Sequence, residues 1–131
     1  MRILQQNKEV LMIPKFRAWL IEEKEMCEVL DLDFEEKFSK VNRKKLLGSG
    51  SHFSFEEIHL MQWTGLVDSE GMEIFKDDIV KDITFEDQDV VEVIEVRFEN
   101  DCHRLGWNLP TDRIYKIIGN IHANPELLED K

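Results

Sequence analysis

The sequence predicts a mainly β fold, and two features of the residue pattern predict it. Apolar and polar residues alternate over short stretches, and polar turns that contain Gly, Asp or Ser separate several of these stretches. Alternation with a period of two places every second side chain on one face of a strand. Short strands joined by tight polar turns are typical of a small all-β barrel or sandwich.

Length and composition indicate one domain. The chain has 131 residues, 42% of them hydrophobic, which is enough for a core that buries about two-thirds of the unfolded surface. We expect a single β-rich domain over residues 13–131, preceded by an N-terminal extension at residues 1–12. No apolar run approaches the ~20 residues of a membrane span, and no secretory leader is visible. Cys27 and Cys102 fit reduced cytosolic thiols better than a disulfide framework, although a bridge between them is not excluded.

The first part of the domain predicts two paired strands and a helix. Residues 13–21 and 26–34 each alternate, and Pro14 suits the start or edge of a strand. Residues 35–47 carry apolar side chains at roughly helical spacing, so a short helix is expected there. The side chains expected to face the core are Phe16, Ala18 and Leu20 in the first strand and Leu30, Leu32 and Phe34 in the second.

The stretch at residues 60–82 predicts two tight turns between strands. The run from Asp68 to Gly71 lies between apolar segments, where Asp can hydrogen-bond the following backbone and Gly takes a positive φ without strain. A second polar turn is expected at residues 76–78. Residues 52–62 predict an extended segment with a bend near Glu56.

The C-terminal third predicts two more strands and a final helical turn. Residues 90–99 are expected to form the longest strand, with Ile94, Val96 and Phe98 facing inward. Residues 114–121 carry apolar groups on both faces, which indicates a central strand covered on two sides. Asn124 is expected to cap a helical turn that begins with Pro125.

Three sequence pieces resemble the YopX-like phage proteins. They are Lys15-Phe16-Arg17-Ala18-Trp19, the stretch LMQWTGL…D-x-x-G-x-EIF-x-DDIV that begins at Leu60, and IGNIHANPELL from Ile118 to Leu128. The resemblance implies a phage or prophage origin, an SH3-like barrel with additional strands and short peripheral helices, and no established activity. Asp77 departs from it, since a glutamate is more typical there, and residues 22–55 match no family motif.

Charge argues against a nucleic-acid partner. The net charge is −11, and residues 51–131 carry 19 acidic and seven basic side chains. Such a surface repels phosphate backbones, whose binding depends on basic groups that displace counterions. Acidity keeps a small protein soluble, and it also suits docking on a basic surface of a host protein.

The candidate binding residues are aromatic or basic. Exposed aromatic side chains let small barrels recognise peptides or bases, and Trp63 and Trp107 are the candidates, although plugging the ends of a barrel is an alternative role. Trp107 lies in a Gly/Asn/Pro stretch and is expected to be the more exposed. The basic cluster Arg43, Lys44 and Lys45, which precedes a Gly/Ser loop, is a candidate phosphate contact.

No pattern in the sequence points to catalysis, a metal or another cofactor. The histidines His52, His59, His103 and His122 lack metal-ligand spacing, and the acidic pairs lie in polar turns. We therefore expect a non-enzymatic interaction module in the cytoplasm of a bacterial host, which binds a host or phage protein and forms a homo-oligomer. A nucleic-acid-binding accessory protein is the alternative, and an enzyme is the third possibility.

Overall fold

The computed structural model describes residues 14–43, 50–100 and 105–129. These residues form strands and three 3-10 turns, with no α-helix among them, so the mainly β prediction is confirmed. In chain order they are β1 (Phe16–Leu20), β2 (Glu25–Asp33), β3 (Phe38–Asn42), β4 (Gly50–Ser54), η1 (Phe55–Glu57), β5 (Ile58–Val67), β6 (Glu73–Phe75), β7 (Asp78–Phe85), η2 (Glu86–Gln88), β8 (Val90–Glu95), β9 (Phe98–Asn100), β10 (Leu105–Trp107), β11 (Tyr115–Asn120) and η3 (Pro125–Leu128).

The strands pair in three antiparallel sheets. Their orders are β4-β3-β2-β1-β5-β6, β11-β7-β8 and β10-β9. These pairings do not close into a ring, because β4 and β6 remain the two ends of the largest sheet. The SH3-like barrel therefore stays a prediction, and the expected peripheral helices are 3-10 turns in the part of the chain described.

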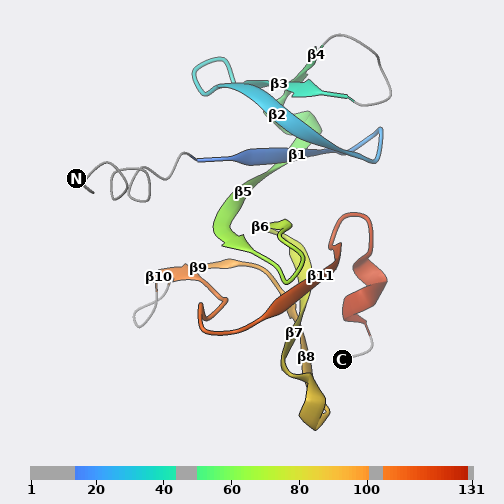
Figure 1. Cartoon of the computed structure of the whole chain (residues 1–131). Coiled ribbons are helices and arrows are strands. Elements are labelled where there is room, and N and C mark those ends of the chain that lie inside the picture. The colour runs from blue at the N-terminus through green and yellow to red at the C-terminus, as the bar shows by residue number, and fades with distance from the viewer. Residues whose placement is uncertain (1–13, 44–49, 101–104, 130–131) are drawn as a thin grey trace, which may run out of the picture.

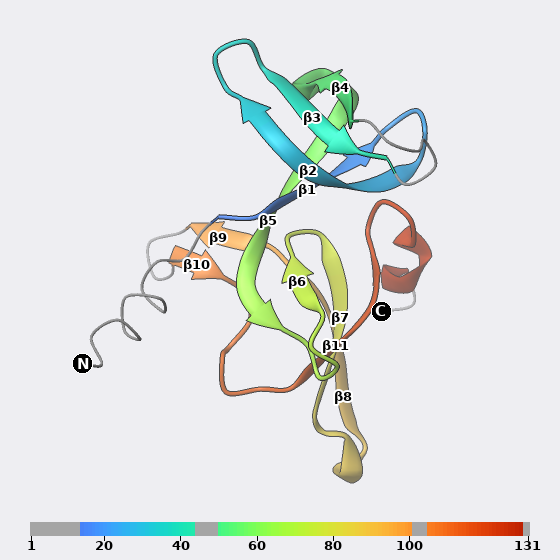
Figure 2. The ribbon, with the colours of Figure 1, turned by 45° about the horizontal axis from the view of Figure 1, so that its top comes forward.

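Two hydrophobic clusters divide the described residues into an N-terminal lobe (16–43 and 50–60) and a C-terminal lobe (63–100 and 105–129). Figures 1 and 2 show β5 running from the first lobe into the second. The buried residues are Ala18, Leu20, Cys27, Val41 and Ile58 in the N-terminal lobe, and Ile74, Val80, Val96, Leu109 and Tyr115 in the C-terminal lobe.

Strand β5 joins the lobes because it changes partner along its length. Its first half pairs with β1 up to Gln62, and its second half pairs with β6 at Trp63 and Val67, with a shift of register between those two pairs. Gly65 lies in that shift with φ +89°, a conformation that L side chains rarely adopt. The register shift at Gly65 therefore bends β5 from one lobe into the other.

The expected turns around β5 are confirmed. The bend near Glu56 is η1, where the Ser54 N–H donates to the Glu57 carboxylate (2.8 Å). In the β5–β6 hairpin, Oδ1 of Asp68 accepts two backbone N–H groups at 2.9 Å, and Gly71 takes φ +83°. Asp68 is buried, so these bonds satisfy a carboxylate that has little access to water.

Two predictions for residues 26–47 are wrong in the part described. Residues 35–42 form a turn and β3 instead of a helix, because Asp33 Oδ1 accepts the N–H groups of the next turn and Lys37 takes φ +62° to close a hairpin. Leu30 and Phe34 are 50% and 66% exposed, while Cys27 faces the core. A register shift in β2 opposite β3, between residues 29 and 31, leaves Cys27 and Val29 toward the core and makes Leu30 the extra, exposed residue.

Residues 90–99 form two strands instead of one. The break lies at residues 96–97, where the Val96 N–H donates to Asp78 O (2.9 Å) and the Arg97 N–H donates to Asn108 Oδ1 (2.9 Å). Val96 is buried as expected, but Phe98 is 50% exposed because it lies beyond this corner.

Strand β11 ends a sheet instead of lying at its centre. Its outer edge is occupied by the β5–β6 turn: Ser69 N–H donates to Tyr115 O (2.7 Å), and Ile117 N–H donates to Asp68 Oδ2 (3.1 Å). The turn after β11 begins at Pro125 as expected, but the Asn124 side chain does not cap it and instead accepts the Asn120 N–H (3.2 Å). A Cβ added at Gly119 would lie 2.6 Å from Asn124 Oδ1 and 2.8 Å from Leu127 Cδ1, so both of these side chains would have to shift.

Candidate binding groove

A groove lies where β1 and β2 separate. Their ladder runs from Leu20 opposite Glu25 to Arg17 opposite Glu28 and ends there. Beyond it, β2 pairs only with β3, and β1 pairs only with β5. Within the described residues, the two strands therefore turn unpaired edges toward each other.

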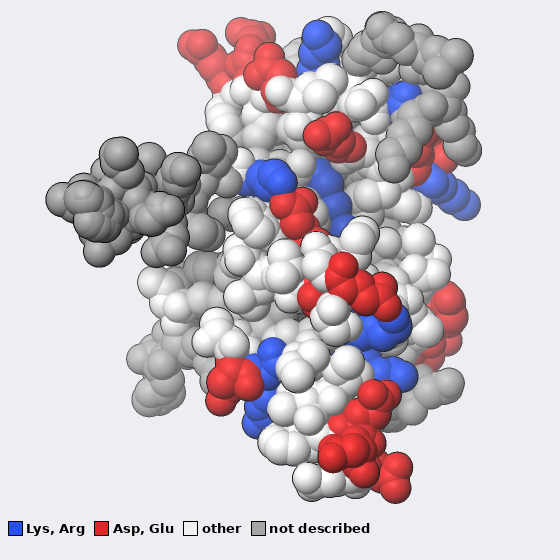
Figure 3. Space-filling view, viewed as in Figure 1, with Lys and Arg blue, Asp and Glu red and all other residues white. Residues whose placement is uncertain are grey.

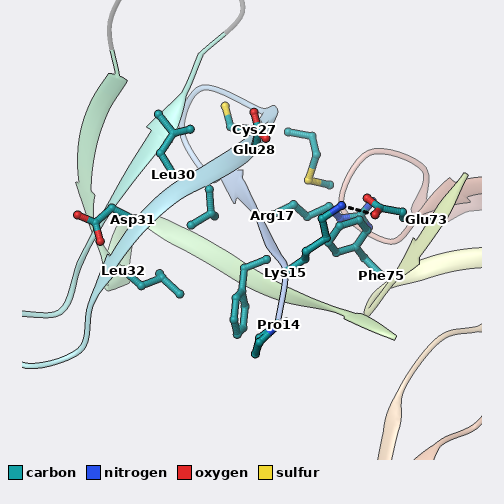
Figure 4. Close-up of a pocket in the computed structure, with 13 residues that line it drawn as sticks. Pro14, Lys15, Arg17, Cys27, Glu28, Leu30, Asp31, Leu32, Glu73 and Phe75 are labelled. Atoms are coloured by element: carbon teal, nitrogen blue, oxygen red, sulfur yellow. Dashed lines mark hydrogen bonds and ion pairs between the residues drawn. The ribbon is translucent and has the colours of Figure 1, made fainter. Parts of the chain in front are cut away.

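The walls of the groove are largely apolar. It has a volume of about 780 Å³, within the roughly 300–1,000 Å³ usual for ligand sites. Figure 4 shows Leu30 and Leu32 on β2 on one side of the gap, with Pro14 at the start of β1 and Phe75 on β6 across it. The remaining apolar lining residues are Phe16, Met26, Cys27 and Val29.

Among the described residues, the basic side chains on the groove are paired, whereas two of its acidic side chains are not. Lys15 pairs with Glu73, and Arg17 pairs with Asp78. Glu28 and Asp31 also line the groove, and their side chains have no ion pair or hydrogen bond within the described part of the chain. The groove therefore presents two carboxylates that form no ion pair with the described residues, beside apolar walls.

Arg17 connects the groove to the junction of the lobes. Its Nη2 donates to Asp78 Oδ1 (2.7 Å), and its guanidinium lies 4.7 Å from the centre of the Phe75 ring. Asp78 Oδ2 accepts the Phe75 N–H (2.8 Å). Burial is the largest influence on this carboxylate and raises the pKa of Asp78 even though Arg17 lowers it. The Arg17 Nε is buried and has no hydrogen-bond partner among the described residues.

A stack of three rings also fastens the lobes together. His122, from the turn after β11, stacks between Trp19 on β1 (5.8 Å between ring centres) and His59 on β5 (4.7 Å). His122 Nε2 lies 3.0 Å from Asp77 Oδ2, and Asp77 O accepts the Ile121 N–H (3.0 Å). These contacts give the cluster a structural role between the lobes.

The predicted tryptophans lie outside the groove. Trp63 is half-buried, its Nε1 donates to Leu66 O (2.9 Å), and Lys15 Nζ lies 5.5 Å from its ring centre. Trp107 is half-buried too, packs against the C-terminal core and meets Phe98 edge to face. The sequence predicts that Trp107 is the more exposed of the two, but both are half-buried, because β9 and β10 pair and the Trp107 ring packs against the core.

The predicted basic cluster is described only at Arg43. Both its Nε (3.1 Å) and Nη2 (2.8 Å) donate to Glu25 Oε1, and this hydrogen bonding raises the pKa of Arg43. Arg43 is therefore neutralised by a carboxylate on β2. Lys44 and Lys45 lie outside the described residues.

Sequence reasoning missed the groove and the ring stack. Asp77, Asp78 and His122 lie within the family motifs, yet no local spacing shows that these two motifs meet. Among the described residues, no three His, Cys, Asp or Glu side chains are placed to hold a metal. No helix in the described ranges is long and apolar enough to span a membrane.

The fold and the groove define a class: a two-lobed antiparallel β protein with an open, partly apolar groove at the junction of its lobes. The chain belongs to the YopX protein family, whose model matches residues 15–129. It is similar to the crystal structure of protein EF1440 from Enterococcus faecalis, with 32% identity and a TM-score of 0.59, over 89% of this chain and 99% of that one. None of the curated proteins matches it.

Proposed function

We propose that this protein is a non-enzymatic interaction module that binds a partner protein of a phage or its bacterial host. The groove carries this proposal, because it combines apolar walls with unpaired strand edges that lack a partner in the described chain. The buried carboxylates at the junction of the lobes support a structural role there rather than catalysis. Asp77 and Asp78 are both engaged in contacts between the lobes.

The charges support a protein partner over a nucleic acid. A phosphate backbone needs basic side chains that are free to replace its counterions, but Arg43 is already bound to Glu25. Figure 3 shows acidic side chains at the outer ends of both lobes, with both signs mixed between them. This distribution supports binding to a basic protein surface.

We extend the proposal to the setting and the assembly state. A phage origin and the cytoplasm of the bacterial host are proposed from the family resemblance, and the free, buried thiol of Cys27 supports a reducing compartment. A homo-oligomer is proposed because Val90 and Val91 are 57% and 44% exposed on β8, the end strand of its sheet. An SH3-like barrel remains the proposed architecture of the family.

The test is capture of a partner that depends on the groove. Tagged wild-type protein, Leu30→Asp and Leu105→Asp are expressed in a bacterial host, cross-linked and recovered for mass spectrometry. Leu30 lines the groove, whereas Leu105 is 73% exposed on β10 and serves as the matched control. We expect one protein to be enriched by the wild type and the control and lost with Leu30→Asp. Recovery of no such protein, or equal recovery by both variants, would refute the proposal.

A further inference from the structure

We propose that the groove binds an extended segment of the partner, which pairs with the free edge of β2 as an added strand and alternates apolar with basic side chains. The inference rests on the proposed interaction function and specifies the chemistry of the partner.

The backbone of β2 offers the pairing surface. Among the residues that the structure describes, β2 beyond Glu28 pairs only with β3, so its other edge presents N–H and C=O groups over residues 29–33 that no described strand pairs with. This edge is about 16 Å long at the ~3.3 Å rise per residue of a strand. An exposed edge of this kind is a template for an added strand, whose main-chain hydrogen bonds supply affinity.

The neighbouring β1 limits what else can fill the gap. Pro14 lies at its start and lacks an N–H group, and Lys15 O already accepts the Trp63 N–H (2.8 Å) on the side of β5. β1 therefore presents little to pair with, and an incoming strand is directed to β2.

The apolar walls of the groove favour a partner segment with apolar side chains at alternate positions. An added strand turns every second side chain to the same face. The register shift in β2 places Val29 and Leu32 on one face, opposite Val41 and Ser39, and both line the groove together with Phe16 and Phe75. Leu30 is 50% exposed, so covering it removes apolar surface from water.

The unpaired carboxylates specify basic side chains at the other positions. Glu28 and Asp31 are exposed on the groove, whereas its cations Lys15 and Arg17 are already paired. The chain contains a precedent, because β1 occupies the same edge of β2 just before the groove. There, Arg17 lies directly opposite Glu28, and the next residue, Ala18, lies opposite Cys27. The net charge of −11 also favours encounter with a basic segment.

The probe is a fluorescently labelled seven-residue peptide of alternating lysine and valine, titrated with the full chain and followed by fluorescence anisotropy. Three comparison peptides are used: one with glutamate for lysine, one with the same composition in blocks, and one with N-methyl groups on alternate backbone amides. We expect saturable binding of the first peptide, none of the glutamate peptide, and about tenfold weaker binding of the block and N-methyl peptides, since N-methylation removes main-chain donors.

Protein variants locate the contact. Glu28→Gln with Asp31→Asn is expected to weaken binding about fivefold at low salt and less at high salt, because the pairs are exposed. The matched control, Glu86→Gln with Asp87→Asn on η2, removes the same charge far along the chain and is expected to leave binding unchanged. Equal effects of the two double variants would overturn the inference.

The remaining outcomes separate this inference from the proposed function. Equal binding of the N-methyl peptide, or no peptide binding, overturns the strand addition, while a captured partner that depends on Leu30 leaves the interaction function standing. If the peptide does not bind and no partner that depends on Leu30 is captured, both proposals are refuted. Light scattering tests whether a second copy fills the groove instead. A dimer that dissociates in Leu30→Asp, and that the peptide does not displace, would show this and would also overturn the inference.

Discussion

Replacement of Asp78 by alanine tests the ion pair that fastens the two lobes. The Asp78 side chain is 2% exposed and that of Arg17 is 16% exposed, and their atoms lie 2.7 Å apart. Asp78→Ala leaves the Arg17 guanidinium buried without its carboxylate and the Phe75 N–H without its acceptor. Removing one partner of a buried pair costs about 3–5 kcal/mol of unfolding free energy. For a chain of this size we expect the melting temperature to fall by about 10 °C or more.

The double variant Arg17→Met with Asp78→Ala sharpens the test. Burial raises the pKa of Asp78 despite the opposing effect of Arg17, so desolvation outweighs the attraction between them. Removing both charges therefore removes a desolvation penalty together with the attraction, and only the Phe75 N–H remains unsatisfied. We expect the double variant to be more stable than Asp78→Ala alone.

Urea unfolding followed by tryptophan fluorescence and circular dichroism measures these free energies. Lys15→Met is the matched control, because Lys15 also joins β1 to the C-terminal lobe but does so through an exposed pair with Glu73. Lys15→Met is expected to lower the free energy of unfolding by less than about 1 kcal/mol. If Asp78→Ala cost no more than Lys15→Met, the reasoning that the buried pair fastens the lobes would be refuted.

Three further variants test other parts of the structure. Burial opposes the ionised form of Asp68, but three backbone N–H bonds outweigh it and lower the pKa of Asp68. The ionised carboxylate therefore stabilises the fold above the ordinary pKa near 4, and this stabilisation is lost as pH falls through the pKa of the folded state. Urea titrations should show Asp68→Asn destabilised by about 1–3 kcal/mol at pH 7 and less so below pH ~4, and a pH-independent difference would contradict this. Burial, followed by the nearby Glu25, raises the pKa of the Cys27 thiol to about 11. In a Cys102→Ser background, iodoacetamide at pH 8 should therefore alkylate the folded chain about a hundredfold more slowly than the unfolded chain. Equal alkylation rates would contradict the raised pKa. Gly119→Ala should cost about 1–3 kcal/mol in thermal unfolding, because its Cβ meets Asn124, and an unchanged melting temperature would exclude that clash.

Local signals were sufficient for most strands and turns. The alternation predicted from residue 13 to residue 21 and the Asp68–Gly71 turn depend on neighbouring residues alone. The structure shows the first as β1 over Phe16–Leu20 and shows the turn as expected. The helix prediction failed over residues 35–42 because the apolar spacing of Phe34, Phe38 and Val41 suits a helix. Pairing with two neighbouring strands outweighs that weak preference.

The groove depends on contacts that no local pattern encodes. It exists because the β1–β2 ladder ends at Arg17 while β2 continues along β3, and because β6 lies across the gap. The ion pair between Arg17 and Asp78 joins residues far apart in the sequence. The local sequence predicts a polar turn at residues 76–78, but the structure buries Asp78 between the lobes.

Amide hydrogen exchange tests the groove most directly. Exchange is measured for residues 29–33 of β2 in the full chain, with and without the lysine–valine peptide at saturation. An added strand would hydrogen-bond amides of this edge, so we predict slower exchange there and unchanged exchange in β8 and β10. Unchanged exchange at residues 29–33, or protection confined to another strand, would contradict the account.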